Sequence, residues 1–232
     1  MQYFILIAFL IGCGIASVYT DKLTIAGALT GVVFGFLLYR GAGWTGIALM
    51  ATFFVLGTAA TSWKHNKKER LGIAEKNKGR RKASQVFANG GVAALLALLA
   101  YIYPQQKDLF QLMIAAAFSS ATADTLSSEL GTVYGKKFYN ILSFKKDRRG
   151  LDGVISVEGT FCGIIGSCII ALVYAIGFGW NLNFLWIVIA GTIGNLSDSL
   201  LGASVERRHV LNNDAVNFLN TLIAAVTILI FV

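Results

Sequence analysis

Long apolar runs separated by short polar connections make up most of the chain. They cover residues 2–20, 23–39, 44–63, 84–103, 109–128, 156–178, 182–201 and 214–232. Several of them approach the roughly 18–20 residues that a helix needs to cross a bilayer. Helices and closed barrels are the only structures that span hydrocarbon, and the alternating segments of a barrel are absent. The pattern therefore predicts an all-α, polytopic transmembrane bundle of about eight spans, some short or broken, in a single integral-membrane domain over residues 1–232.

The composition supports a membrane protein. Hydrophobic residues make up 56% of the chain, charged residues only 14%, and proline occurs once. The net charge of +8 could attract nucleic acid, but the charges lie between the apolar runs. This placement fits membrane topology and lipid phosphates better, so we expect the lipid bilayer and no nucleic acid as a partner.

Basic residues concentrate in three connections. The segments 64–83, 131–153 and 202–213 hold most of the 20 Lys and Arg residues. With eight spans, all three connections lie on the same side of the membrane, and the positive-inside rule makes that side cytoplasmic. We therefore expect an inner-membrane protein with cytoplasmic loops and with both termini outside.

Carboxylates lie near the cytoplasmic ends of several apolar runs. Asp124 belongs to the fifth run, Asp198 to the seventh and Asp214 to the eighth. Charges at such positions are costly unless they are paired, solvated or bound to metal, so they are functional candidates. Further polar side chains fall at a similar depth: Asn89, Glu129, Asp152, Asn213 and Asn217.

Oxygen ligands beside basic loops suit a hard cation that carries phosphates. Mg²⁺ takes a few carboxylates together with water and substrate phosphate oxygens. Basic residues nearby would neutralise phosphoryl charge. Walker A and HExxH motifs are absent from the sequence, which argues against a soluble-type nucleotide fold.

Structural roles remain open for several of these residues. Asp214 could be a helix N-cap or a first-turn acid, with Asn213 as the rival cap. Asn89 and Asn217 could form hydrogen bonds between helices. The basic run at 64–82 is also typical of a segment that sets topology and faces lipid.

Glycines recur at four-residue intervals in two runs. Gly27, Gly31 and Gly35 lie in the second run, and Gly159 and Gly163 lie in the sixth. Such stripes are typical of close helix–helix packing in membranes, and we expect no chemistry from them.

Four segments together resemble a known family. They are residues 75–91 (EKNKGRRKASQVFANGG), 123–131 (ADTLSSELG), 152–160 (DGVISVEGT) and 198–217. The chain resembles the integral-membrane family that includes the chloroplast phytyl-phosphate kinase of tocopherol synthesis. That family is more distantly similar to dolichol kinases and phosphatidate cytidylyltransferases. The resemblance covers roughly residues 60–225, and the combination of motifs is more specific than any one of them.

The resemblance implies transfer of a γ-phosphoryl group from a nucleotide, with CTP expected, to an isoprenyl monophosphate such as phytyl phosphate. It implies catalytic roles for Asp124, Glu129, Asp198 and Asp214. We expect Asp124, Asp198 and Asp214 to bind Mg²⁺. The expected substrate-binding residues are Asn89, Asp152, Asn213, Asn217, Arg80, Arg81 and Arg208. Val154 stands where many relatives are expected to have a second glycine.

The sequence thus favours a magnesium-dependent lipid-phosphate kinase at the cytoplasmic membrane face. A cytidylyltransferase that releases pyrophosphate is an alternative. A cation- or proton-coupled transporter is another, although the outer halves of the runs carry almost no polar side chains to form a path. A non-catalytic scaffold and a homo-oligomer also stay open.

Overall fold

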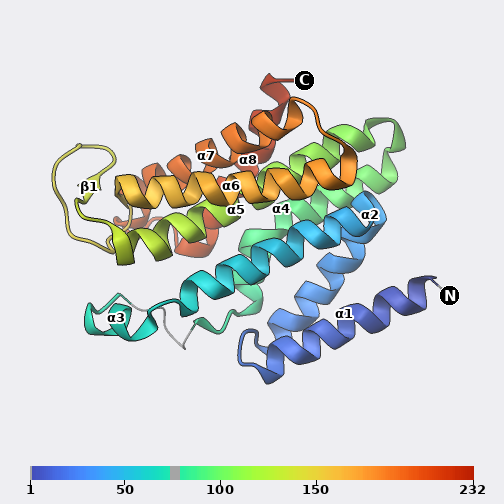
Figure 1. Cartoon of the computed structure of the whole chain (residues 1–232), viewed down its shortest axis with the longest axis horizontal. Helices are drawn as coiled ribbons and strands as arrows, with labels where there is room; N and C mark the ends of the chain where they lie inside the picture. The colour runs from blue at the N-terminus through green and yellow to red at the C-terminus, as the bar shows by residue number, and fades with distance from the viewer. Residues whose placement is uncertain (1, 74–78) are drawn as a thin grey trace.

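The computed structural model describes residues 2–73 and 79–232, and helices dominate this part of the chain (Figure 1). The α-helices are α1 (Gln2–Tyr19), α2 (Ile25–Ser62), α3 (His65–Arg70), α4 (Ala83–Ile102), α5 (Lys107–Tyr134), α6 (Val157–Phe178), α7 (Asn183–Leu201) and α8 (Asn213–Thr227). The shorter elements are η2 (Pro104–Gln106), β1 (Tyr139–Asn140), β2 (Val154–Ile155), η3 (Gly202–Glu206) and η4 (Ile228–Ile230). Among the described residues, seven helices are long and apolar enough to cross a membrane. The predicted all-α polytopic bundle is confirmed.

Helix α2 corresponds to two predicted spans. Its backbone turns sharply at Gly43, where φ is 61°, a value that glycine adopts without steric cost. The segment just before the helix lies beside its last residue, since Lys22 Nζ donates a hydrogen bond of 3.3 Å to Ser62 Oγ. Figure 1 shows the two halves of α2 folded back into a V. Each half is about 27 Å long at 1.5 Å per residue, close to the thickness of a bilayer's hydrocarbon core.

Helix α5 lies at the centre of the bundle. It packs against α2, α4, α6, α7 and α8, and the side chains of its middle turns are buried. Small residues allow this crowding: a Cβ on Gly163 of α6 would lie 3.0 Å from the Ala123 carbonyl oxygen of α5. The predicted glycine stripe of the sixth run is therefore a close helix contact. Helix α1 packs mainly against α2, which leaves much of its apolar surface for lipid.

The three basic connections meet at one end of the bundle. Lys67 Nζ donates to the Val133 carbonyl at 2.9 Å, which joins the first connection to the end of α5. Arg207 forms an ion pair with Asp147 at 2.9 Å, which joins the third connection to the second. Figure 1 shows α3 and β1 at this same end. Lys76 and Lys78 lie outside the described residues, and the cytoplasmic orientation of this end stays a prediction.

The connection between α5 and α6 folds back over the bundle. Strands β1 and β2 pair antiparallel, with Tyr139 opposite Ile155 and Asn140 opposite Val154. Val154, which replaces the expected second glycine, therefore lies in a strand. The turn before it relies instead on Gly153, whose φ is 69°. The fold-back brings residues 150–156 against the ends of α5 and α7.

Candidate functional site

A pocket of about 320 Å³ opens at the end of the bundle where the basic connections meet. This volume is near the lower end of the about 300–1,000 Å³ range of small-molecule sites. Carboxylates from three parts of the chain line it: Asp124 and Glu129 from α5, Asp152 from the connection, and Asp198 and Glu206 from α7 and η3. Hydroxyl and amide groups supply much of the remaining wall: Ser127, Ser128, Thr132, Ser156, Asn195, Ser199 and Asn213. The pocket is therefore rich in oxygen ligands.

Asp124 and Asp198 face each other across the pocket from different helices. Their carboxyl groups lie within hydrogen-bonding reach of one another. Two ionised carboxylates this close repel strongly, so a proton or a cation must lie between them. The pair is the strongest chemical feature of the pocket.

A buried hydrogen-bond network fixes the orientation of Asp198. Asn220 Nδ2 of α8 donates to Asp198 Oδ2 at 2.6 Å. Ser120 Oγ of α5 in turn donates to Asn220 Oδ1 at 3.0 Å. Both Ser120 and Asn220 are fully buried. Hydrogen bonds to an ionised acceptor are stronger than neutral ones, so this network holds the carboxylate in one position.

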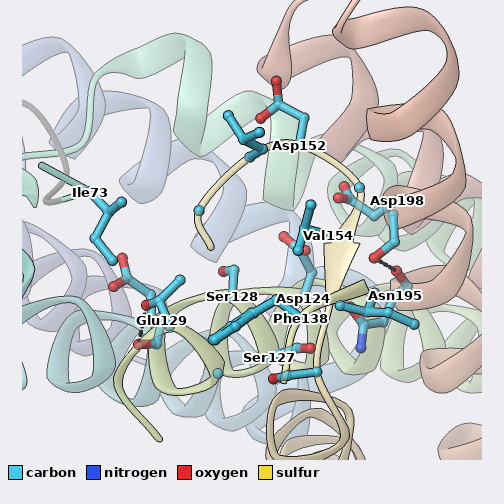
Figure 2. A pocket seen from close by; sticks show the side chains of 18 of the residues that line it. Ile73, Asp124, Ser127, Ser128, Glu129, Phe138, Asp152, Val154, Asn195 and Asp198 are labelled. Atoms are coloured by element: carbon cyan, nitrogen blue, oxygen red, sulfur yellow. Dashed lines mark hydrogen bonds between the residues drawn. The ribbon is translucent and has the colours of Figure 1, made fainter. Parts of the chain in front are cut away.

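Glu129 has a different partner. It forms an ion pair with Lys68 of α3, whose side chain is 1% exposed. Lys68 Nζ also donates to the carbonyls of Ala60 at 2.8 Å and Thr61 at 3.1 Å, at the end of α2. These contacts dock α3 against α5 and bring Ile73 into the pocket wall (Figure 2).

The loop that carries Asp152 forms a roof over the pocket. Figure 2 shows this loop arching over Asp124 and Ser128. Arg207 holds the roof in place, because its Nε donates to the Asp152 carbonyl at 2.6 Å and its Nη1 pairs with Asp147. The Arg148 backbone N–H and the Arg207 guanidinium both lower the pKa of the Asp147 carboxyl.

Arg207 is positioned by a π-type turn. The turn, η3, follows α7 directly, and the Arg207 backbone N–H donates to the Gly202 carbonyl at 3.2 Å. Such turns are frequent at functional sites. The Nη2 atom of Arg207 is enclosed and has no hydrogen-bond partner among the described residues.

The profile of the integral membrane protein family DUF92 matches residues 8–225. The chain belongs to this family. Protein VTE6 of the Arabidopsis thaliana chloroplast is 36% identical to the DUF92 chain over 211 residues, which cover 88% of this chain and 63% of VTE6. The uncharacterized membrane protein sll0875 of Synechocystis is 32% identical over 196 residues, 83% of this chain and 76% of that protein. The uncharacterized membrane protein MJ0933 of Methanocaldococcus jannaschii is 33% identical over 200 residues, 86% of this chain and 82% of that protein. No solved structure matches the chain.

Five of the residues singled out in the sequence of the DUF92 chain line the same pocket. They are Asp124, Glu129, Asp152, Asp198 and Asn213. Glu129 does so although it lies five residues beyond Asp124 on the same helix. Their catalytic and binding roles stay predictions.

Asp214 does not line the pocket, so the structure does not bring the expected metal trio together. The N-cap of α8 is Asn212, whose Oδ1 accepts a hydrogen bond of 2.9 Å from the Ala215 N–H. Asp214 is thus a first-turn acid, turned about 100° from the pocket-lining Asn213. Within residues 2–73 and 79–232, no group of three His, Cys, Asp or Glu side chains is arranged to hold a metal ion.

The other expected substrate-binding residues also lie outside the pocket lining: Asn89, Asn217, Arg80, Arg81 and Arg208. Asn89 Nδ2 donates to the Gln85 carbonyl within its own helix. Arg80 pairs with Asp21, and Arg208 is exposed. Arg81 lines a separate cavity.

The structure adds functional candidates that the sequence did not single out: Lys68, Glu206, Arg207 and Asn220. Asn220 lies three residues after Asn217 in the same polar stripe, which is a usable signal. Lys68 and Arg207 lie among other basic residues, and nothing in their spacing distinguishes them from their neighbours.

Proposed function

We propose that the chain transfers the γ-phosphoryl group of a nucleoside triphosphate, with CTP the expected donor, to an isoprenyl monophosphate. The observation that carries the proposal is the Asp124–Asp198 pair, held by two helices in a polar pocket beside the basic connections. The family resemblance to the phytyl-phosphate kinase supports the same chemistry. The chain spans only 63% of the length of VTE6, so the nucleotide and the lipid substrate named here are themselves part of the proposal.

The donor atoms of the pocket fit a magnesium ion. Mg²⁺ usually takes one or two protein carboxylates and fills its other positions with water and phosphate oxygens. Asp124 and Asp198 would hold it, and a bound ion would neutralise charge on the nucleotide phosphates. Asn220 would keep Asp198 oriented for this role.

The reaction needs positioning more than proton transfer. An oxygen of the acceptor monophosphate would attack the γ-phosphorus, the bond from that phosphorus to the β–γ bridging oxygen would break, and the nucleoside diphosphate would leave. The acceptor is already ionised, so the pocket needs no general base. Ser127, Ser128 and Asn213 would donate hydrogen bonds to phosphate oxygens. The roof held by Arg207 would exclude water from the γ-phosphorus.

We also place this site at the cytoplasmic face of the cell inner membrane. The three connections that surround the pocket carry most of the basic residues of the chain, and the positive-inside rule supports this orientation.

The test follows label from the nucleotide. Purified protein in detergent is incubated with Mg²⁺, γ-labelled CTP or ATP, and phytyl, geranylgeranyl or undecaprenyl monophosphate. We expect label in the lipid diphosphate, and its loss in Asp124→Asn and Asp198→Asn. Asp108→Asn is the matched control, because this exposed acid lies in the first turn of α5, at the opposite end from the pocket.

Two results would contradict the proposal. Label released in pyrophosphate, with the nucleoside retained on the lipid, would identify a cytidylyltransferase. No label in any lipid with either nucleotide would reject phosphoryl transfer to this class of acceptor.

A further inference from the structure

Asn195 of α7 lines the pocket that holds Asp124 and Asp198, and it is only 4% exposed. Its side-chain amide forms no hydrogen bond with the described residues, 2–73 and 79–232. The hydrogen bond that Ser199 Oγ donates goes to the Asn195 backbone carbonyl instead. Buried polar groups are almost always satisfied by protein, by ordered water or by an ion. A buried amide without a protein partner, beside two carboxylates, therefore points to a ligand of the pocket.

The packing of α7 against α5 brings this amide to the carboxylates. Asn195 precedes Asp198 by three residues, so the two side chains lie on one face of α7. The helices are in close contact, because a Cβ on Gly194 of α7 would collide with Ser120 of α5. Asp124 lies one turn beyond Ser120 on α5. Figure 2 shows Asn195, Asp198 and Asp124 around the same part of the pocket.

The packing of α6 determines which end of the amide faces the pocket. A Cβ on Gly163 of α6 would lie 2.8 Å from Asn195 Nδ2 and 3.0 Å from the Ala123 carbonyl oxygen. The amide nitrogen therefore lies against α6, in a space that a side chain at position 163 would fill. The oxygen of a carboxamide points away from its nitrogen, so Oδ1 is directed away from α6. The amide thus offers the pocket an acceptor oxygen, which suits a cation.

An amide oxygen beside two carboxylates is a typical ligand set for a hard cation. Two carboxylates and one amide would fill three of the six positions of Mg²⁺ and leave the others for water and phosphate oxygens. The sequence suggests Asp214 as the third ligand, but Asp214 does not line the pocket. Asn195 has the position and the donor atom that Asp214 lacks.

We propose that Asn195 Oδ1 is the third protein ligand of the ion that Asp124 and Asp198 hold. The three oxygens bind the ion before the nucleotide arrives, and phosphate oxygens of the nucleotide then replace water at the remaining positions. The use of this ion in phosphoryl transfer rests on the proposed function. The ligand assignment itself is tested by ion binding without turnover.

The test measures binding of Mn²⁺, which takes the same oxygen ligands as Mg²⁺ and is detected by EPR. Purified protein in non-ionic detergent is titrated without nucleotide or lipid substrate. We expect Asn195→Ala to weaken Mn²⁺ binding at least about tenfold, which is about 1.4 kcal/mol. Asn195→Asp keeps an oxygen at this position, so it should bind Mn²⁺ at least as tightly as the wild type.

Thr192→Val is the matched control on the same helix. Thr192 lies one turn before Asn195 and does not line the pocket. Its hydroxyl donates to the Val188 carbonyl of α7 at 2.8 Å. The substitution removes a polar group near Asn195 without touching the pocket, and it should leave Mn²⁺ binding unchanged.

Thermal unfolding separates an ion ligand from a residue that only packs. The Asn195 amide has no hydrogen bond within the described chain to lose, so Asn195→Ala should melt with the wild type in the presence of a chelator. Added Mn²⁺ should raise the Tm of the wild type more than that of Asn195→Ala, because an ion that binds the folded state stabilises it. In turnover, Asn195→Ala should need more Mg²⁺ for half-maximal label transfer, and Asn195→Asp should not.

Each contrary result has one meaning. Unchanged Mn²⁺ binding in Asn195→Ala, equal losses in Asn195→Ala and Asn195→Asp, or no Mn²⁺ binding to the wild type overturns the ligand assignment. If Asn195→Ala loses Mn²⁺ and Asn195→Asp keeps it, but no label reaches any lipid, the ligand assignment stands and the proposed function fails. If label is transferred while Asn195→Ala keeps the wild-type affinity for Mn²⁺, the proposed function stands and the ligand assignment fails.

Discussion

The ion pair between Lys68 and Glu129 offers the sharpest test of how the pocket is held together. The Lys68 side chain is 1% exposed and that of Glu129 is 12% exposed. Lys68→Met would leave the Glu129 carboxylate without its counter-charge. It would also leave the Ala60 and Thr61 carbonyls without the donor that now satisfies them. We therefore expect this substitution to destabilise the fold strongly.

The expected loss follows from the burial of the pair. Removing one partner of a buried ion pair costs about 3–5 kcal/mol, because the remaining charge stays buried and uncompensated. In a protein of this size, 1 kcal/mol shifts Tm by about 2–4 °C, so Lys68→Met should lower Tm by about 6–20 °C. Replacing both partners by apolar residues, as in Lys68→Met with Glu129→Leu, should recover most of the loss. The two carbonyls would remain unsatisfied, at a residual cost of about 1–3 kcal/mol.

Thermal unfolding in detergent, followed by fluorescence-detected size exclusion, measures the two single variants and the double variant. Lys136→Met is the control, because Lys136 is an exposed lysine of another basic connection. The reasoning is refuted if Lys68→Met melts with the wild type. It is also refuted if the double variant is no more stable than Lys68→Met, since the cost would then not come from an uncompensated Glu129.

Three further predictions concern the roof and the network of the pocket. Arg207→Gln should lower label transfer about tenfold or more, because it removes the hydrogen bond that holds the roof in place. Arg208 is exposed, so Arg208→Gln should leave label transfer unchanged, and equal losses in the two variants would contradict the role of Arg207. Asn220→Leu removes the hydrogen bond to the Asp198 carboxylate, and such a bond contributes about 1.5–3 kcal/mol. The value of kcat should therefore fall about 10- to 150-fold, and a wild-type kcat would show that the network has no role in the reaction. The Asp147 carboxyl has a lowered pKa in the folded chain, so the stability it contributes is present above its ordinary pKa of about 3.9 and is lost as the pH falls through the folded value. Proteolysis of the loop at 143–153 should therefore increase only below about pH 4, and it should lose this pH dependence in Asp147→Asn.

The spans could be predicted from the sequence because bilayer thickness fixes their length and polarity. The same physics located the basic connections, and contacts such as Lys67 with Val133 confirm that two of them meet at one end. The sequence did not reveal that the runs at 23–39 and 44–63 follow each other without a loop and are joined by a sharp bend at Gly43. The bend depends on the positive φ of Gly43, and hydropathy carries no information about backbone angles.

The sequence predicted how far along each helix the residues of the candidate site lie, but not which side of the helix carries each side chain. Asp124, Asp198 and Asn213, the residue before Asp214, line one pocket, and their common level could be read from the ends of the apolar runs. The direction of each side chain depends on how the helices are rotated against one another, which close contacts such as that of Gly163 with Ala123 decide. Asp214 consequently lies outside a pocket that its neighbour on α8 lines.

The carboxylates of the pocket differ in how their charge is compensated, and this difference separates their roles. Glu129 already has a cationic partner in Lys68. In the part of the chain that the structure describes, no ion pair involves Asp124 or Asp198. The hydrogen bond that Asp198 accepts comes from the neutral amide of Asn220, which orients the carboxylate without cancelling its charge. A divalent ion would therefore gain most at the Asp124–Asp198 pair, whereas the ion pair of Glu129 with Lys68 holds α3 against α5.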